Sequence, residues 1–195
     1  LTDEDRRTLL AAAEQGTDRL TSLVTNLLDM NRLQTGAVKP LDRPTVIEEV
    51  VQRAIGGLPL SAVVSEVGED LPVVHTDPAL LERILANVIE NAARQASGGV
   101  PVRVLAGEIS EPERHVDIRV VDQGPGVPVS QRSEIFEPFL RSGDHKHAQA
   151  GGVGLGLAVA AGLAQLIGAQ IDVEDTPGGG LTMVISVPVE RGESQ

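Results

Sequence analysis

The stretch Val121-Asp122-Gln123-Gly124-Pro125-Gly126 constrains the fold more than any other part of this 195-residue chain. It follows an apolar, strand-like run with Val116, Ile118 and Val120, and it ends that run with a carboxylate and two glycines. Burying the carboxylate unpaired would be costly, but a ligand's amino group would give it a hydrogen bond. The glycines allow positive φ and close backbone approach. The stretch is therefore either a binding loop or a turn in which the aspartate caps its own backbone.

A second glycine cluster, Gly151-Gly152-Val153-Gly154-Leu155-Gly156-Leu157, runs directly into an apolar helical segment that ends near Gly168. Its backbone amides are expected at a helix N-terminus, where anions are favoured. The cluster predicts a phosphate-binding loop, and a flexible hinge is the alternative interpretation.

A helix-patterned segment from Asp77 to Ala96 carries three polar residues at spacings of four and three: Asn87, Asn91 and Arg94. Asp77 as N-cap and Pro78 at the first helical position predict where this helix begins. The three polar side chains are expected on one side of it, next to the apolar stripe. An ordinary polar helix face is the alternative.

Composition excludes some functions. The formal charge of −12 and the pI near 4.7 argue against nucleic-acid binding, which needs a basic face. The chain has no cysteine, which removes disulfides and thiolate catalysis and fits a reducing, cytoplasmic compartment. A hydrophobic content of 41% is enough for a core. No apolar run reaches the roughly 20 residues that span a bilayer.

The remaining pattern predicts an α+β fold. Strands are expected at 62–67, 73–75, 100–105, 115–121, 170–174 and 181–187, and a short helix, capped by Thr45, before Gly56-Gly57. Helices and strands then alternate so that a layer of helices covers one face of a mixed sheet.

Residues 3–34 predict one long amphipathic helix. Its apolar positions alternate three and four apart, as in a helical bundle: Leu9, Ala13, Gly16, Leu20, Leu23, Leu27 and Met30. Such a seam favours a partner helix, and folding back onto its own domain is the alternative.

The two glycine loops, the Asn87-to-Ala92 stretch and Phe136-Glu137-Pro138-Phe139 resemble, in this order, the four boxes of the histidine-kinase ATP-binding domain. That superfamily also contains gyrase, Hsp90, MutL and the anti-sigma-factor kinases. The stretches 20–36, 76–83 and 175–188 are similar to sensor kinases of the Kdp type, the potassium and turgor sensors. The resemblance implies a Bergerat-type α/β sandwich that binds ATP with Mg²⁺ and transfers the γ-phosphate to a histidine.

The resemblance also implies roles for particular residues. Asp122 would accept from the adenine amino group, and Asn91 with Asn87 would hold Mg²⁺. The loop glycines would surround the nucleotide, Arg94 and a lid residue would approach its phosphates, and the phenylalanines would anchor the lid by hydrophobic packing. The nucleotide-binding set is Asp122, Gly124, Gly126, Phe136, Phe139, Arg141, Lys146, Gly152, Gly154, Leu155, Gly156 and Thr182, and the catalytic set is Asn87, Asn91 and Arg94.

Two departures from the family pattern bear on function. Hydrolases of the superfamily carry Glu where Asn87 stands, and an amide cannot act as a base, so Asn87 favours transfer over hydrolysis. Arg94 and Gln95 replace the usual Lys and aromatic residue, which keeps an inactive nucleotide sensor open as an alternative. An ATPase or switch module is the other alternative, and Asn87 disfavours it.

The expected domains are 1–35, the second helix of a dimerisation and histidine-phosphotransfer domain; 36–45, a linker; 46–190, the ATP-binding domain; and 191–195, a tail. The chain opens without Met in helix-type sequence, so we expect a piece of a longer protein with any membrane anchor upstream. A response regulator and a second copy of the intact kinase are the expected partners.

Overall fold

The computed structural model describes residues 2–59, 61–96, 99–139 and 154–189, although not every side chain of the first helix. Four α-helices, two short 3₁₀ turns and seven strands form these segments. Their bounds are α1 (Asp3–Gln34), β1 (Arg43–Thr45), α2 (Ile47–Ile55), β2 (Val63–Glu66), β3 (Val74–Thr76), α3 (Pro78–Gln95), β4 (Val102–Ile109), β5 (His115–Val121), η1 (Val129–Gln131), η2 (Glu134–Phe136), α4 (Gly156–Ile167), β6 (Gln170–Asp175) and β7 (Leu181–Pro188).

The main sheet has five strands in the order β2-β4-β5-β7-β6. Strand β2 runs parallel to β4, and the other neighbours are antiparallel, so the sheet is mixed. Strand β5 alternates strictly: Val116, Ile118 and Val120 are buried, while the residues between them are only partly covered. The strand pattern of the sequence therefore selects the face of β5 that meets the core.

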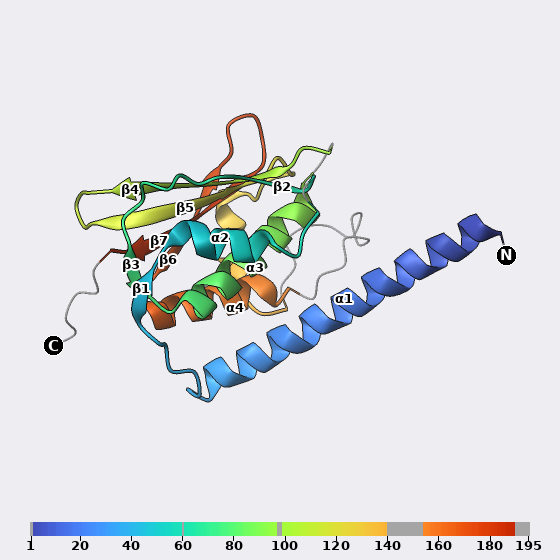
Figure 1. The fold of residues 1–195 in the computed structure, drawn as a ribbon, viewed down its shortest axis with the longest axis horizontal. Helices are drawn as coiled ribbons and strands as arrows, with labels where there is room; N and C mark the ends of the chain where they lie inside the picture. Colours follow the sequence, from blue (N-terminus) through green and yellow to red (C-terminus); the bar gives the residue numbers. More distant parts are fainter. Residues whose placement is uncertain (1, 60, 97–98, 140–153, 190–195) are drawn as a thin grey trace.

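Helices α2, α3 and α4 cover that face of the sheet, as Figure 1 shows with the strands above the helices. The core between the two layers includes fully buried Leu81, Ile84 and Leu85 of α3 and Val159 and Leu163 of α4. The opposite face of the sheet carries ion pairs such as Arg119 with Asp117 and with Glu174. The predicted α+β fold, with helices on one face of a mixed sheet, is confirmed.

Helix ends follow the predicted local chemistry. The Asp77 carboxylate accepts from the amides of Ala79 and Leu80 at 2.9 and 3.1 Å, and Pro78 occupies the first helical position. Helix α4 stops at Gly168, which adopts φ +72° and donates its amide to Ala164 and Gln165. Helices α3 and α4 pack against each other, and Asn87 of α3 lies close to Gly156 at the start of α4.

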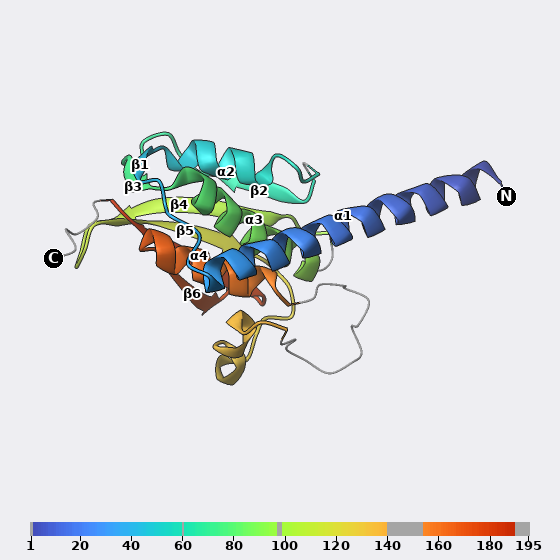
Figure 2. The ribbon, with the colours of Figure 1, turned by 90° about the horizontal axis from the view of Figure 1, so that it is seen from below.

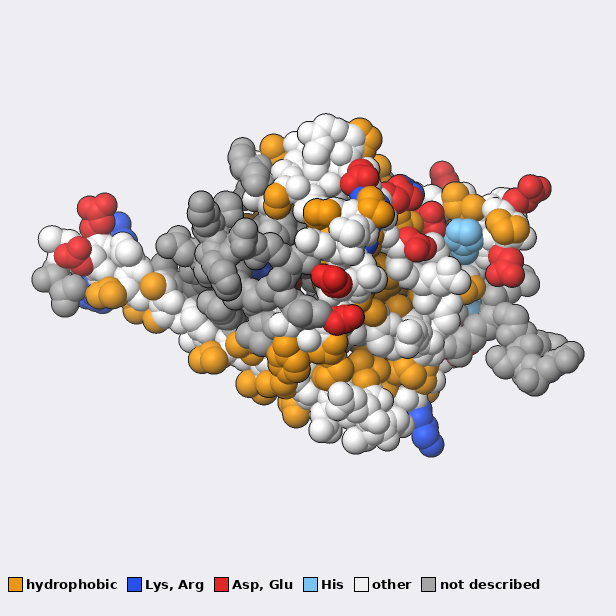
Figure 3. All heavy atoms as spheres, turned by 180° about the vertical axis from the view of Figure 1, so that it is seen from behind, with side chains coloured by type: hydrophobic (Ala, Val, Ile, Leu, Met, Phe, Trp, Pro, Cys, Tyr) orange, Lys and Arg blue, Asp and Glu red, His pale blue; other side chains and the backbone are white. Residues whose placement is uncertain are grey.

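Helix α1 is a long rod that reaches well beyond the rest of the chain (Figures 1 and 2). Among the described residues, its C-terminal part packs on the domain through Met30 and Leu33, and its contacts are chiefly with α4. Of the predicted seam, Leu9, Leu20 and Leu27 are at least half exposed, whereas Met30 packs against the core. Hydrophobic side chains follow this rod in the space-filling view (Figure 3).

The structure corrects three expectations near the linker. Residues 43–45, assigned to a linker, form strand β1, which pairs with β3 in a separate two-stranded ladder. Strand β3 is therefore outside the main sheet. Thr45 does not cap α2: Val46 is the N-cap residue, and the Thr45 hydroxyl donates instead to backbone carbonyls within the ladder. A pairing between segments about thirty residues apart has no local sequence signal.

Candidate nucleotide site

Asp122 lies at the exit of β5 and is 4% exposed. Its Oδ1 accepts from the amide of Gly124 at 2.7 Å and from the amide of Leu181 at 3.1 Å. The first bond is a local turn and the second crosses to β7, so Asp122 both caps its own loop and joins two segments. Both bonds end on Oδ1, which leaves Oδ2 available to a ligand.

Two glycines of this loop are required by close contacts. A Cβ at Gly124 would lie 2.6 Å from the carbonyl oxygen of Gln95, at the C-terminal end of α3. A Cβ at Gly126, where φ is +71°, would lie 3.2 Å from the carbonyl oxygen of Gly180. The loop is therefore held between the end of α3 and the β6–β7 turn, so the carboxylate and the α3 amides lie at the same end of the domain.

The three polar residues of α3 differ in burial. Asn87 is 3% exposed, and its Nδ2 has no hydrogen-bond partner among the residues that the structure describes. Asn91 is half-buried. Arg94 is exposed and forms an ion pair with Glu90 at 3.8 Å. The helix therefore directs Asn87 and Asn91 toward its neighbours, while Arg94 lies at the edge.

The start of α4 meets Asn87 directly. Leu155 is the N-cap residue and is 2% exposed, and Gly156 opens the helix. A Cβ at Gly156 would lie 3.4 Å from Oδ1 of Asn87. The missing side chain leaves room between the amide oxygen and the helix N-terminus, where anions are favoured. Amide oxygens with an anion site beside them form a donor set that suits Mg²⁺ and phosphate.

The two phenylalanines behave differently. Phe136 is partly buried and packs against the core, whereas Phe139 is 64% exposed with φ +66°. The expectation that both anchor the lid by packing is therefore wrong for Phe139 in this structure. Its amide donates to the carbonyl of Gly154 at 3.2 Å, which ties the segment to the glycine cluster by backbone instead. The predicted site residues Arg141, Lys146 and Gly152 lie outside the described residues.

Thr182 lies on β7 directly opposite Val121, one residue before Asp122. It is 4% exposed, and its hydroxyl shares a hydrogen bond of 2.9 Å with the hydroxyl of Thr176. The pair lies under the β6–β7 turn. The sequence analysis did not identify Thr176 or Gly180 as site residues. A Cβ at Gly180 would lie 2.1 Å from the carbonyl oxygen of Asp122. The run of three glycines at 178–180 was the only signal for Gly180.

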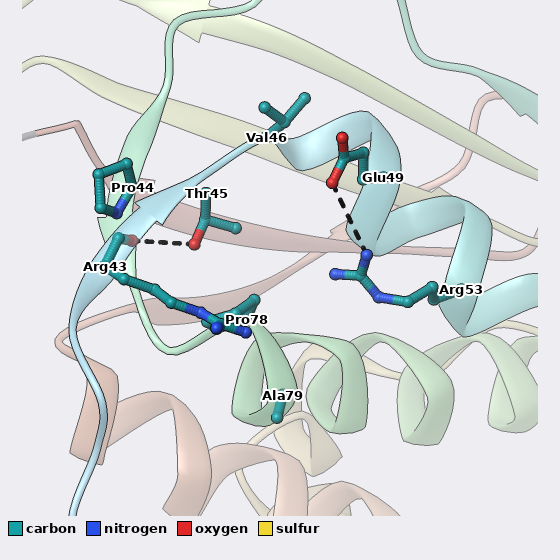
Figure 4. Close-up of a pocket in the computed structure, with 8 residues that line it drawn as sticks. All are labelled: Arg43, Pro44, Thr45, Val46, Glu49, Arg53, Pro78 and Ala79. Carbon is teal, nitrogen blue, oxygen red and sulfur yellow. Dashed lines mark hydrogen bonds and ion pairs between the residues drawn. The ribbon is translucent and has the colours of Figure 1, made fainter.

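A surface pocket of about 290 Å³ lies elsewhere, between β1, α2 and the start of α3 (Figure 4). Arg43, Glu49 and Arg53 contribute its charged groups, and Glu49 pairs with Arg53 at 3.8 Å. None of its lining residues is a predicted site residue. The pocket is therefore separate from the Asp122 loop.

The described residues contain neither a cluster of metal-ligating side chains nor a helix that could cross a membrane. No group of three or more His, Cys, Asp or Glu side chains in them could hold a metal ion. No helix among the same residues has the length and apolar character to cross a membrane.

Comparisons with known proteins identify the family. Residues 76–191 match a family model described as histidine kinase-, DNA gyrase B-, and HSP90-like ATPase. The chain is 45% identical over 194 residues to Sensor protein KdpD of Mycobacterium tuberculosis (strain ATCC 25618 / H37Rv), covering 94% of this chain and 22% of that protein. It is 34% identical over 171 residues to Sensor protein KdpD of Escherichia coli (strain K12), covering 86% and 19%. The chain thus spans about a fifth of the length of these relatives.

Solved structures give the same fold. The crystal structure of full-length ShkA in complex with AMPPNP superposes with a TM-score of 0.74 at 28% identity, covering all of this chain and 41% of that one. The mycobacterial sensor histidine kinase MprB superposes with a TM-score of 0.61 at 28% identity, covering 76% and 97%.

Proposed function

We propose that this chain, which belongs to the family of histidine kinase-, DNA gyrase B- and HSP90-like ATPases, transfers the γ-phosphoryl group of Mg·ATP to a histidine. It is the ATPase-type domain of a two-component sensor histidine kinase similar to KdpD. The observation that carries the proposal is Asp122: a buried carboxylate whose Oδ1 is held by two backbone amides while Oδ2 is left for a ligand.

The Asp122 carboxylate would select the base. It can accept a hydrogen bond from the adenine amino group but meets a carbonyl oxygen in guanine at the same place. Gly124 and Gly126 keep side chains out of the loop, so the backbone can lie close to the base. Thr182 lies on the adjoining strand and would complete this end of the site.

Asn91 and Asn87 would hold Mg²⁺ through their amide oxygens, which are hard ligands of the kind it prefers. Bound there, the ion would neutralise charge on the phosphates. The start of α4, from Leu155 and Gly156, would receive those phosphates with its backbone amides. Arg94 at the helix edge would need to leave Glu90 to reach them.

Asn87 bears on the reaction type. Hydrolysis needs a base near the attacking water, and a neutral amide cannot accept that proton. Asn87 is 3% exposed, so water from bulk solvent cannot readily reach its position to accept the proton instead. This supports transfer to a histidine over the alternative of an ATPase or switch module. The second alternative is an inactive nucleotide sensor. Such a sensor would bind ATP without transferring phosphate, so a transfer assay distinguishes it from a kinase.

We also propose a role for helix α1 and for the whole protein. Helix α1 would be the second helix of a dimerisation and phosphotransfer domain, because its exposed apolar side chains suit a partner helix: Leu9, Leu20, Val24, Leu27 and Leu28. The intact kinase would be a homodimer that passes phosphate to a response regulator, in potassium or osmotic sensing. Its ATP-binding domain would work in the cytoplasm, with the membrane reached through other segments.

The test combines binding and transfer. Calorimetry with ATP and GTP, with and without Mg²⁺, should show tighter, magnesium-dependent binding of ATP. Label from γ-labelled ATP should then appear on a separately supplied phosphoacceptor hairpin faster than free phosphate is released. Equal affinities for ATP and GTP would contradict the proposed recognition of adenine by Asp122. Release of phosphate without transfer would favour the ATPase. Binding of ATP without either reaction would favour the inactive sensor.

A further inference from the structure

Asn26 is buried although it lies on the helix that is otherwise most exposed. It is 8% exposed, whereas Val24, Leu27 and Leu28 beside it are each at least half exposed. Its face of α1 continues with Asp29, Met30 and Leu33, at helical spacings of three, four and seven.

This face of α1, which we call the seated face (Asn26, Asp29, Met30 and Leu33), lies on the domain. A Cβ at Gly162 of α4 would lie 2.9 Å from Cδ1 of Leu33, so the two helices meet closely at this glycine. Met30 packs against the core as well. Leu27 and the other exposed apolar side chains of α1 lie off the seated face. Contact of the seated face with the domain therefore does not cover the surface that suits a partner helix.

Arg83 of α3 fixes the orientation of Asn26. Its Nε donates to Oδ2 of Asp29 at 2.9 Å, and its Nη2 donates to the Asn26 side chain, also at 2.9 Å. A guanidinium only donates hydrogen bonds, so the amide atom that faces it must be the oxygen. The Asn26 Nδ2 is therefore turned away from Arg83.

That Nδ2 lies at the start of α4. It is 3.9 Å from the position of a Cβ at Gly156, and Oδ1 of Asn87 is 3.4 Å from the same point. Asn87 is itself buried, and its Nδ2 has no partner in the described part of the chain. A donor from α1 thus lies beside the helix N-terminus, where an anion is favoured. The Asn87 atom at this point is Oδ1, the proposed magnesium ligand, and not its unpartnered Nδ2.

We propose that helix α1 completes the phosphate end of the nucleotide site, with Asn26 donating to a phosphate oxygen and with Arg83 and Asp29 as positioning residues. This rests on the proposed function, because it takes the start of α4 as the phosphate end. Linkage makes the effect reciprocal: if the seated helix tightens Mg·ATP binding, Mg·ATP must tighten the seating of the helix. The nucleotide would then be sensed by the helix that carries the dimerisation surface.

The test compares Mg·ATP with adenosine, which lacks phosphates, by calorimetry on the whole chain. Asn26→Ala and Arg83→Gln should each weaken Mg·ATP binding about fivefold, as the loss of one hydrogen bond implies, and leave adenosine binding unchanged. Gly162→Leu, which pushes Leu33 off α4 without touching the site, should act in the same direction. Arg53→Gln is the matched control, because it removes the 2.9 Å pair with Glu82, also on α3 but without contact to α1.

Hydrogen exchange gives a second readout. Amides of residues 26–34 should gain protection with Mg·ATP but not with adenosine, and Arg83→Gln should abolish the gain. The proposal is overturned if Asn26→Ala binds Mg·ATP as the unchanged chain does, or if adenosine binding falls equally. If the unchanged chain binds no adenine nucleotide, the proposed function fails as well; tight ATP binding with no effect of Asn26→Ala rejects only the role of α1.

Discussion

At the scale of single residues, Asp122 is the residue that we propose recognises adenine. Asp122→Asn replaces Oδ2 or Oδ1 with a donor, so either the base or one of the two backbone amides loses its acceptor. We expect ATP affinity to fall by about 1 to 3 kcal/mol, the cost of a mispaired buried group. Calorimetry measures the loss. Asp117→Asn on the open face of β5 is the control, and an equal loss there would show a general effect of charge.

Gly180 is the second residue on which the site depends. Its φ is +113°, and a Cβ would lie 2.1 Å from the carbonyl oxygen of Asp122. Gly180→Ala should therefore destabilise the fold by roughly 3 kcal/mol or more, because the loop must move as well as adopt a strained backbone. Gly178→Ala is the matched variant, because Gly178 has φ +93° and no atom within 4 Å of a Cβ, and it should cost only about 1 to 2 kcal/mol. Urea unfolding measures the free energy of unfolding of both variants. Equal losses would show that a Cβ at Gly180 does not collide with the carbonyl of Asp122.

At the scale of elements, α3 carries core residues and the proposed magnesium ligands on adjoining faces. Asn91 is half-buried, so Asn91→Ala should leave stability nearly unchanged. It should remove most of the difference in ATP affinity measured with and without Mg²⁺, because an amide ligand is lost. Gln95→Ala, on the same helix with an exposed side chain, is the control. A magnesium dependence that survives Asn91→Ala would show that the ion is held elsewhere.

The edge of the sheet supplies a pH-dependent contribution. Arg103 of β4 donates to both oxygens of Glu66 of β2 at 2.7 and 2.8 Å, and these hydrogen bonds lower the pKa of Glu66 below its ordinary 4.5. Because the pKa is lower in the folded chain, the stabilisation is fully present above 4.5 and is lost as the pH falls through the lowered value.

Arg103→Gln should therefore be slightly less stable than the unchanged chain at pH 7, and the difference should vanish in acid. The effect is small and weakens with salt, because both side chains are exposed. Urea unfolding of both chains over a pH series, at low and high salt, measures it. A difference that persists unchanged in acid would show that the arginine acts through packing.

At the scale of the whole molecule, we expect that this chain binds ATP without phosphorylating itself. A phosphoacceptor of the family lies in a His-Asp/Glu-x-x-Arg/Lys-x-Pro stretch, and none of the four histidines has that setting. His75 precedes Thr-Asp-Pro and His115 precedes Val-Asp, while His145 and His147 lie outside the described residues. Incubation with γ-labelled ATP should leave no acid-labile label on the chain. Label that maps to one of these histidines would contradict this.

The sequence by itself determined the local features. Periodicity located the four α-helices and the strands other than β1. Asp77 and Gly168 marked where α3 begins and α4 ends, and the four motifs in their order indicated the family. These features depend on residues within a few positions of one another. Hydrogen bonding along a helix, alternation along a strand and glycine at a positive φ are all set by neighbours in the chain.

Only the tertiary structure decided which groups meet. It joined Asp122 to Leu181, removed β3 from the main sheet, left Phe139 exposed and seated Asn26 against Arg83. The bonds from Asp122 to Leu181 and from Arg83 to Asn26 join residues 59 and 57 positions apart. No local preference encodes such distant pairs, because they depend on how whole elements pack. A polar residue on a helix also gives the same sequence pattern whether it faces water or another helix.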